Sequence, residues 1–296
     1  MPSALRKDVP WIDDAADGPE YLDPVYYDRI LKPYVFSGVD DLALFRRYLS
    51  RSHLPQKASI LEIGPGTGRA SRLLSHDRRR FEIDLVDQSQ RMLKYLESTL
   101  ALEGTARYLR SDAVTYLAKT SHTYDCVLSL WSLSHSIHQN IADKGEVRGQ
   151  GLAAYALRRL FGSVLKRSGK FFIIHFDSTS DEQTVSLRQR CRIEPWLKVG
   201  SPSPSQVIVE RVLAESAAEG IIRFNKQHMV GSPIIYSDLD EAMEVFMNFH
   251  MEGVFNRTRE FSRVLDALAT DLARYRMPDG TVALEPACFI YEGTRL

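Results

Sequence analysis

The stretch Ile60–Arg69 reads Ile-Leu-Glu-Ile-Gly-Pro-Gly-Thr-Gly-Arg, an apolar strand that runs into three glycines at alternate positions. A helix-compatible segment follows it. Because Gly64, Gly66 and Gly68 have no Cβ atom, the chain can turn sharply here and its amides can lie against a ligand. The positive end of the following helix would point at the same ligand. The stretch therefore predicts a cofactor-binding turn between a strand and a helix.

The spacing of the glycines bears on the kind of cofactor. A dinucleotide site needs Gly-x-Gly-x-x-Gly, which would put the third glycine at position 69, where this chain has Arg69. A second apolar run, 81–86, ends at Asp87. A carboxylate at the carboxyl end of the neighbouring strand can accept hydrogen bonds from both hydroxyls of a ribose. The spacing disfavours a dinucleotide, and the carboxylate indicates a ligand that contains a ribose.

Strand-like and helix-like runs alternate along the chain from Lys57. We expect strands at 58–63, 81–87, 107–111, 124–131 and 170–176, and helices at 68–76, 89–103, 113–119 and 151–166. Such alternation makes a parallel sheet with helices on both faces, because right-handed crossovers place a helix between neighbouring strands. Ligands then bind at the carboxyl ends of the strands.

The flanking segments have a looser pattern. Residues 1–20 suggest a loose arm, followed by two helices, one from about 24 to 34 and one from about 39 to 50. After position 176 we expect helices at 181–192, 205–219, 238–250 and 257–275, part of a strand at 221–224 and a final strand at 281–291, with a turn-rich connector at 201–205.

Four pieces occur in a familiar order: the glycine turn, Asp87, the pair Asp112 and Ala113 after the third strand, and the fourth strand at 124–130. Their spacing resembles the class I S-adenosylmethionine-dependent methyltransferases, well over 57–176 and in outline elsewhere. The resemblance implies an α/β fold with a doubly wound, mostly parallel seven-stranded sheet, Rossmann-like, whose last strand is antiparallel. It also implies an N-terminal arm and helical lid over 1–56, and a methyltransferase domain over 57–296 with a helical connector segment inserted around 178–235.

The resemblance further implies S-adenosyl-L-methionine as cofactor and S-adenosyl-L-homocysteine as product. Carried over by position, Glu62 and the three glycines would face the methionine portion of the cofactor. Asp87 would hold the ribose diol, and Gln88 would lie along the adenosine. A simpler role for Asp87, as the cap of the helix that follows, also fits its position.

Two further cofactor contacts follow from the same resemblance. Asp112 with Ala113 would contact the adenine, the carboxylate accepting from the exocyclic amine, although Asp112 also suits a helix cap. Trp131 would lie against the adenosine. It could equally face a cationic substrate or pack in the core.

The segment 129–139, after the fourth strand, is the expected catalytic segment. His135 or His138 would take a proton from an attacking hydroxyl or amine, because an unperturbed imidazole titrates near pH ~6.5. Either histidine could instead cap a helix or pack. As a His-x-x-His pair they could bind a metal, but no third ligand with a recognisable spacing accompanies them, so we predict no metal.

The amino-acid composition limits the kinds of partner that we expect the protein to bind. Lys and Arg total 38 and Asp and Glu total 38, so no net charge draws the protein toward nucleic acid or an anionic membrane. No run approaches the ~20 apolar residues of a membrane span, and no signal peptide is recognisable, which predicts a cytoplasmic protein. The three cysteines suggest neither a disulfide framework nor a zinc site. The oligomeric state, a homodimer included, stays open.

The function expected from these observations is methyl transfer to an O or N atom of a small, partly aromatic metabolite. The Pro-Pro-Tyr motif of nucleic-acid base methyltransferases is missing after the fourth strand, where the chain reads Ser-Leu-Trp-Ser at 129–132. One alternative is a scaffold that binds the cofactor or another protein without transferring methyl groups. Another is an NAD-dependent oxidoreductase, which the glycine spacing disfavours.

Overall fold

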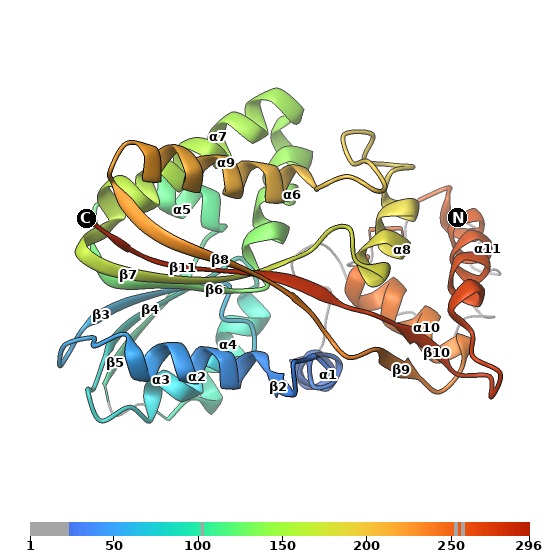
Figure 1. Cartoon of the computed structure of the whole chain (residues 1–296), viewed down its shortest axis with the longest axis horizontal. Coiled ribbons are helices and arrows are strands. Elements are labelled where there is room, and N and C mark those ends of the chain that lie inside the picture. Colours follow the sequence, from blue (N-terminus) through green and yellow to red (C-terminus); the bar gives the residue numbers. More distant parts are fainter. Residues whose placement is uncertain (1–23, 102–103, 252–253, 256–257) are drawn as a thin grey trace.

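A seven-stranded sheet forms the centre of the computed structural model, which describes residues 24–101, 104–251, 254–255 and 258–296 (Figure 1). The strand order is β5-β4-β3-β6-β7-β11-β8. The bounds are β3 Ser59–Ile63, β4 Glu82–Asp87, β5 Thr105–Arg110, β6 Tyr124–Leu130, β7 Leu165–Phe176, β8 Ile222–Val230 and β11 Ala287–Arg295. All neighbours pair parallel except β11, which is antiparallel to both β7 and β8. The expected mostly parallel sheet with an antiparallel last strand is confirmed.

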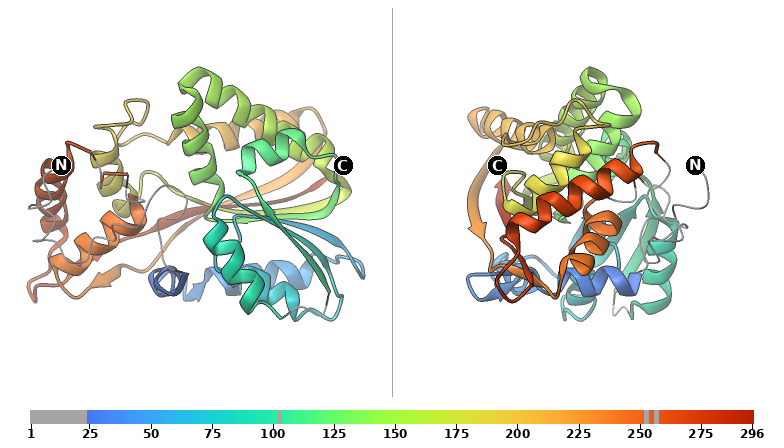
Figure 2. Two further views of the ribbon diagram at one scale, coloured as in Figure 1. Left: turned by 180° about the vertical axis from the view of Figure 1, so that it is seen from behind. Right: turned by 90° about the vertical axis from the view of Figure 1, so that its right-hand side faces the viewer.

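Helices cover both faces of this sheet (Figures 1 and 2). One layer contains α2 Asp41–Arg51, α3 Arg69–Ser75 and α4 Gln90–Thr99, and the other contains α5 Ala113–Lys119, α6 Leu133–Lys144, α7 Glu146–Arg159 and α9 Pro204–Ala218. Successive residues of β6 serve the two layers in turn, since Cys126 and Leu128 belong to one hydrophobic core and Val127 to the other. A strand that is apolar on both faces is typical of a parallel sheet buried between helices.

A further group of elements lies at one end of the sheet, on the right of Figure 1. We call them the cap elements: α8 Asp181–Arg190, β9 Ile234–Tyr236, α10 Leu239–Val245, α11 Phe261–Leu272 and β10 Val282–Leu284. A π-helical turn, Phe246–His250, continues α10, and a 3-10 turn, Ala273–Tyr275, continues α11. β9 and β10 pair as a separate antiparallel ribbon.

The N-terminal part contributes α1 Pro24–Leu31 and a small hairpin of β1 Val35–Phe36 and β2 Val39–Asp40. The arm expected over 1–20 lies outside the described residues. α2, expected as part of a lid, packs Phe45 and Tyr48 against Phe172 of β7, with ring centroids 5.7 and 4.7 Å away. Likewise α9 and β8, within the range expected for an inserted segment, belong to a main helix layer and to the sheet.

Three local features differ from the sequence prediction. The final strand expected at 281–291 is two strands, β10 and β11, separated by Glu285 and Pro286. Proline has no N–H to donate to a ladder, which explains the break. The segment 133–144 is the helix α6, and α7 begins at Glu146 rather than near 151. The mixture of Ser and His in α6 gives too weak an apolar periodicity for its helix to be recognised.

Across the described ranges, no helix is both long and apolar enough to traverse a bilayer.

Candidate functional site

The glycine turn depends on backbone conformations that favour glycine. Gly64, Gly66 and Gly68 have φ angles of 63°, 53° and 84°. A Cβ atom on Gly64 would lie 2.2 Å from the Cβ of Ser132, and one on Gly68 would lie 2.1 Å from a methyl carbon of Leu96. These two glycines therefore let α6 and α4 approach the turn closely.

Asp87, the last residue of β4, is tied to the turn. Its Oδ2 accepts a hydrogen bond from the backbone nitrogen of Gly66 at 3.1 Å, and its Oδ1 accepts one from the nitrogen of Ser89 at 2.9 Å. These two bonds orient the carboxylate at the carboxyl end of β4, beside the turn.

A cavity of about 80 Å³ opens between the turn, the end of β4 and the start of α6. We call it the cofactor cavity. The residues that line it are Tyr27, Gly64, Gly66, Val86, Asp87, Gln88, Ser89, Met92, Ser111, Ala113, Ser132, His135 and Ser136. A second hollow of about 340 Å³ adjoins it and shares Gln88, Ser111 and Ser136. The two hollows are therefore neighbours near the carboxyl ends of β4 and β5.

α1 lies over the turn. The hydroxyl of Thr67 donates a hydrogen bond to Asp28 of α1, and Tyr27 lines the cofactor cavity. The Tyr27 ring also meets Phe249 of the cap elements edge-on, with centroids 5.5 Å apart. Burial raises the pKa of the Tyr27 hydroxyl, which is therefore neutral. α1 therefore contacts both the glycine turn and the cofactor cavity.

The other residues expected at the cofactor lie at the margins of the cavity. Asp112 lines the adjoining hollow and caps α5, accepting from the nitrogen of Thr115 at 2.8 Å. Glu62 is buried behind the turn, where its Oε2 accepts from the hydroxyl of Ser71 at 2.7 Å. Burial raises the pKa of Glu62 to about 7, against the opposite effect of the Ser71 hydrogen bond.

Trp131 lies in the core rather than on the cavity wall. It is 2% exposed and its ring lies tilted against that of Phe176, with centroids 4.6 Å apart. Its indole Nε1 donates to the Oδ2 of Asp41 at 2.7 Å. Asp41 also accepts hydrogen bonds from both terminal nitrogens of Arg69 at 2.8 Å. The indole therefore helps to link α2, α3 and the end of β6.

A second, smaller cavity lies on the other side of His135. We call this space of about 30 Å³ the polar cavity. Four histidines line it, His135, His138, His175 and His250, together with Ser134, Phe176, Ser178, Gln183, Ser186, Leu187, Arg190, Ser203 and Phe249. Burial lowers the pKa of His138 well below its ordinary value and that of His175 to about 4, so both imidazoles are neutral at pH 7. Arg190 is held by Glu194 through bonds of 2.6 and 3.1 Å.

A buried acid lies beside the polar cavity. Glu182 is 0% exposed, and its Oε1 accepts a hydrogen bond from the hydroxyl of Tyr34. The Nε2 of His250 lies 3.2 Å from the same oxygen. Within the described residues, Glu182 Oε2, His138 Nε2 and His175 Nε2 are buried and have no hydrogen-bond partner. Unpaired buried polar atoms are rare in folded proteins and are therefore candidates for ligand contacts.

His175 and His250 were not singled out from the sequence. A usable signal existed for His175, since it sits at the carboxyl end of the fifth expected strand, where α/β sheets place ligands. His250 gave none, because it reaches Glu182 only through the packing of the π-helical turn Phe246–His250 against α8.

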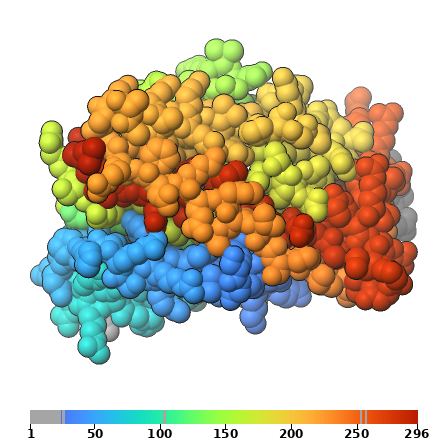
Figure 3. Space-filling view, viewed as in Figure 1, coloured from blue at the N-terminus to red at the C-terminus, as the bar shows by residue number. Residues whose placement is uncertain are grey.

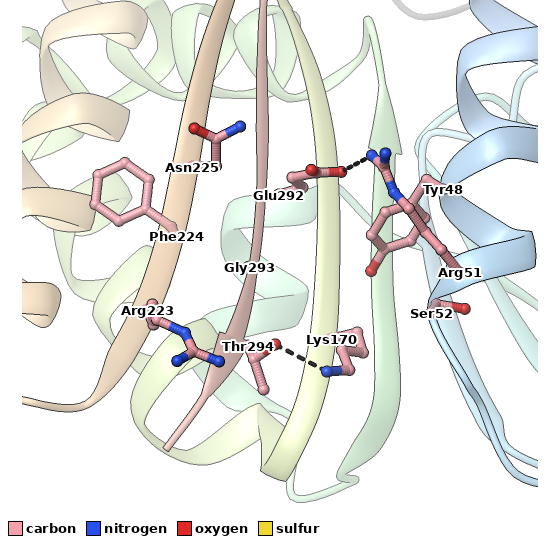
Figure 4. A pocket seen from close by; sticks show the side chains of 10 residues that line it. All are labelled: Tyr48, Arg51, Ser52, Lys170, Arg223, Phe224, Asn225, Glu292, Gly293 and Thr294. Carbon is pink, nitrogen blue, oxygen red and sulfur yellow. Dashed lines mark hydrogen bonds and ion pairs between the residues drawn. The ribbon is translucent and has the colours of Figure 1, made fainter.

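Another hollow, of about 400 Å³, lies elsewhere (Figure 4). Arg51, Lys170 and Arg223 line it; Arg51 pairs with Glu292 at 2.6 Å, and Lys170 donates to Thr294 at 3.0 Å. In the space-filling view β11 (red) is visible between α9 with β8 (orange) and α2 (blue) (Figure 3). The hollow borders the amino-terminal half of β7, away from the edge where such sheets bind ligands.

The comparisons with known proteins agree with this geometry. A family model described as a methyltransferase domain matches residues 60–144. The sequence matches no curated protein. Among solved structures, a loganic acid methyltransferase with SAH has a TM-score of 0.55 at 9% identity, covering 96% of this chain and 98% of that one. The YcgJ protein from Bacillus subtilis has a TM-score of 0.52 at 14% identity, covering 86% and 97%. At these identities the structures show a shared fold.

The sheet order, the glycine turn and the matched domain define a Rossmann-like methyltransferase. Residues 60–144 form a methyltransferase domain, and the chain has the fold of the class I S-adenosylmethionine-dependent methyltransferases. Its cofactor is S-adenosylmethionine, and S-adenosylhomocysteine is the product that remains after transfer. The backbone of Gly64 and Gly66 and the Asp87 carboxylate, which line the cofactor cavity, suit such a nucleoside. No cluster of three or more His, Cys, Asp or Glu side chains suited to a metal occurs among the described residues.

Proposed function

We propose that the protein methylates an O or N atom of a small metabolite whose reacting group enters the polar cavity. The observation that carries this proposal is that His135 lines both the cofactor cavity and the polar cavity. The two cavities therefore meet at the side chain of His135, where a group that enters the polar cavity would come closest to the cofactor. The small size of the cavity favours a single functional group over a macromolecular segment.

Each part of the site has a role in this proposal. Gly64, Gly66 and Ala113 would bring backbone against the cofactor, Asp87 would hold its ribose, and Gln88 would lie along the adenosine. Four other residues would shape the turn and the adjoining hollow without lining the cofactor cavity: Glu62, Gly68, Asp112 and Trp131. α1 would act as the lid that limits the access of water.

Bound S-adenosylmethionine supplies a methyl group that is already electrophilic. The chain then has to hold the nucleophile in line and keep water out, and such positioning can lower a barrier by ~7 to 11 kcal/mol. His135 and His138, which lie one turn apart on α6, would contact the acceptor. Phe176 and Phe249 provide apolar walls for its carbon skeleton.

The proposal is tested with the purified protein, S-adenosylmethionine carrying a labelled methyl group, and separated pools of small metabolites, proteins and nucleic acids. We expect label in the small-metabolite pool, with production of S-adenosylhomocysteine. Label in the protein or nucleic-acid pool would contradict the substrate class. Tight binding of the cofactor without transfer to any pool would instead support a non-catalytic scaffold.

A further inference from the structure

His175 occupies a defined position at the wall of the polar cavity. It is the residue before the last of β7, at the carboxyl edge of the sheet, and it is 1% exposed. Its backbone is fixed on one side by pairing with Phe289 of β11. The side chain is therefore held by the sheet and does not sit on a loop that can move away.

The protonation of His175 follows from its contacts. Its Nδ1 lies 2.7 Å from the carbonyl oxygen of Phe176. A carbonyl oxygen can only accept, so Nδ1 carries the hydrogen and donates it. Because burial lowers the pKa of the ring to about 4, the imidazole is neutral at pH 7 and Nε2 has a free lone pair. This lone pair can accept a hydrogen bond and cannot donate one.

No group in the described part of the chain donates to that lone pair. The titratable and charged groups around His175 are His135 and His138 on α6, Asp177 after β7, Arg190 on α8, Glu210 on α9, His228 on β8 and His250 in the π-helical turn. The cation and the acids among them are engaged: Arg190 with Glu194, Asp177 with His228 at 2.8 Å, and Glu210 with Lys226 at 2.8 Å.

We propose that His175 Nε2 accepts the hydrogen of the substrate's reacting hydroxyl group, so that the protein is an O-methyltransferase of an alcohol or phenol. This inference rests on the proposed function and deepens it. The hydroxyl oxygen forms a bond to the methyl carbon while the bond from that carbon to sulfur breaks and leaves its electron pair on sulfur. The proton of the hydroxyl passes to Nε2, giving an imidazolium that later releases it to water.

The chemistry of the proton separates the hydroxyl from two other acceptors. A carboxylate brings no hydrogen, and its negative oxygen would face the Nε2 lone pair. An amine becomes an ammonium ion on methylation and would keep its proton rather than transfer it to so weak a base. An alkylated hydroxyl oxygen is a much stronger acid than an imidazolium, so its proton passes to a base with the lowered pKa of His175.

The first test measures the tautomer in the wild-type protein, with no substitution. Nitrogen-15 NMR of the histidine rings should show hydrogen on Nδ1 of His175, a bare Nε2, and no change in the ring between pH 8 and pH 5. Hydrogen on Nε2, or titration near the ordinary imidazole pKa, would overturn the inference. Loss of the His175 signal in His175→Gln gives the assignment.

The second test compares His175→Gln with the exposed control His122→Gln. Both should bind S-adenosylhomocysteine like the wild type in calorimetry, because neither side chain lines the cofactor cavity. In His175→Gln we expect kcat to fall by about 100-fold or more, the usual effect of losing a general base, with a much smaller change in KM. An unchanged kcat in a variant that binds S-adenosylhomocysteine normally would overturn the inference.

The third test identifies the methylated atom. With a carbon-13 methyl donor, the NMR shift of the product distinguishes methyl on oxygen from methyl on nitrogen, and mild alkali cleaves a methyl ester but leaves an ether intact. We expect an alkali-stable O-methyl product. An ester or an N-methyl product would refute the role of His175 while leaving the proposed function standing. Absence of any small-molecule product would refute the proposed function itself, whatever the tautomer.

Discussion

The backbone nitrogen of Gly66 donates a hydrogen bond to Asp87 Oδ2 across 3.1 Å, which joins the glycine turn to the end of the neighbouring strand. The other oxygen of Asp87 accepts from the nitrogen of Ser89 at the start of α4. One carboxylate thus fixes two loops that surround the cofactor cavity. The group proposed to hold the ribose also holds the shape of the site.

Substitution of Asp87 should weaken cofactor binding through both roles. Hydrogen bonds to a charged group contribute about 1.5–3 kcal/mol each, so Asp87→Ala should weaken S-adenosylhomocysteine binding by roughly 100-fold or more, as measured by calorimetry. Asp87→Asn keeps one acceptor oxygen and should lose less. Asp279→Ala, at an exposed turn, serves as the control. Equal affinity in Asp87→Ala and wild type would rule out the ribose contact.

Alanine should have opposite effects at two glycines. In Gly64→Ala the new Cβ would lie 2.2 Å from the Cβ of Ser132 on a backbone with φ of 63°, so we expect a loss of roughly 2 kcal/mol or more in unfolding free energy. Gly151 lies within α7, and a Cβ there would meet nothing within 4 Å. Gly151→Ala should therefore stabilise by about 0.5–1 kcal/mol. Urea unfolding of both variants checks the contrast in sign.

The cofactor half of the site was predictable because its signals are local. The strand, the turn and the helix of 60–75 are contiguous, and the position of Asp87 follows from the end of the next strand. The spacing of glycines records a backbone conformation that other residues rarely adopt. Such features need no knowledge of which distant segments meet.

The polar cavity, where we propose that the methyl acceptor binds, was not predictable in the same way. Glu182, His250 and Tyr34 come from segments far apart in the chain, and each has an ordinary sequence context. Their proximity depends on how the π-helical turn Phe246–His250 and the segment after α1 pack against α8. α6 was missed for a different reason: its Ser and His residues give no clear apolar periodicity, although His138 and Ser134 are buried in the fold.

Loss of Asp41 should destabilise the protein strongly. Asp41 is 0% exposed, and its carboxylate accepts hydrogen bonds from Trp131 Nε1 and from both terminal nitrogens of Arg69. Breaking a buried ion pair by removing one partner costs about 3–5 kcal/mol, because the other charge stays buried alone. We expect Asp41→Ala to lose about that much in urea unfolding. Glu215→Ala breaks the exposed pair with Arg158, which should matter by less than about 1 kcal/mol. Similar losses of unfolding free energy in the two variants would contradict the stabilising role of the buried Asp41 carboxylate.

The raised pKa of Glu62 predicts how stability changes with pH. In the folded protein burial raises this pKa to about 7, whereas in the unfolded chain it lies near 4.5. Between these values the folded state holds a proton that the unfolded state has released, so stability falls as pH rises through this window. The contribution is about 3 kcal/mol, fully present below the unfolded value and lost above the folded one.

Comparison with Glu62→Gln isolates this effect, because the buried histidines change stability in the opposite direction over part of the same range. The glutamine is neutral at every pH. From pH 4.5 to pH 7 the unfolding free energy of the wild type should therefore fall relative to that of the variant. Urea unfolding at several pH values gives this difference. A constant difference would show that the pKa of Glu62 is the same in the folded protein and the unfolded chain, so that Glu62 is ionised near pH 7. In that case the site behind the turn would already hold a negative charge, available to the ammonium group of the cofactor's methionine portion.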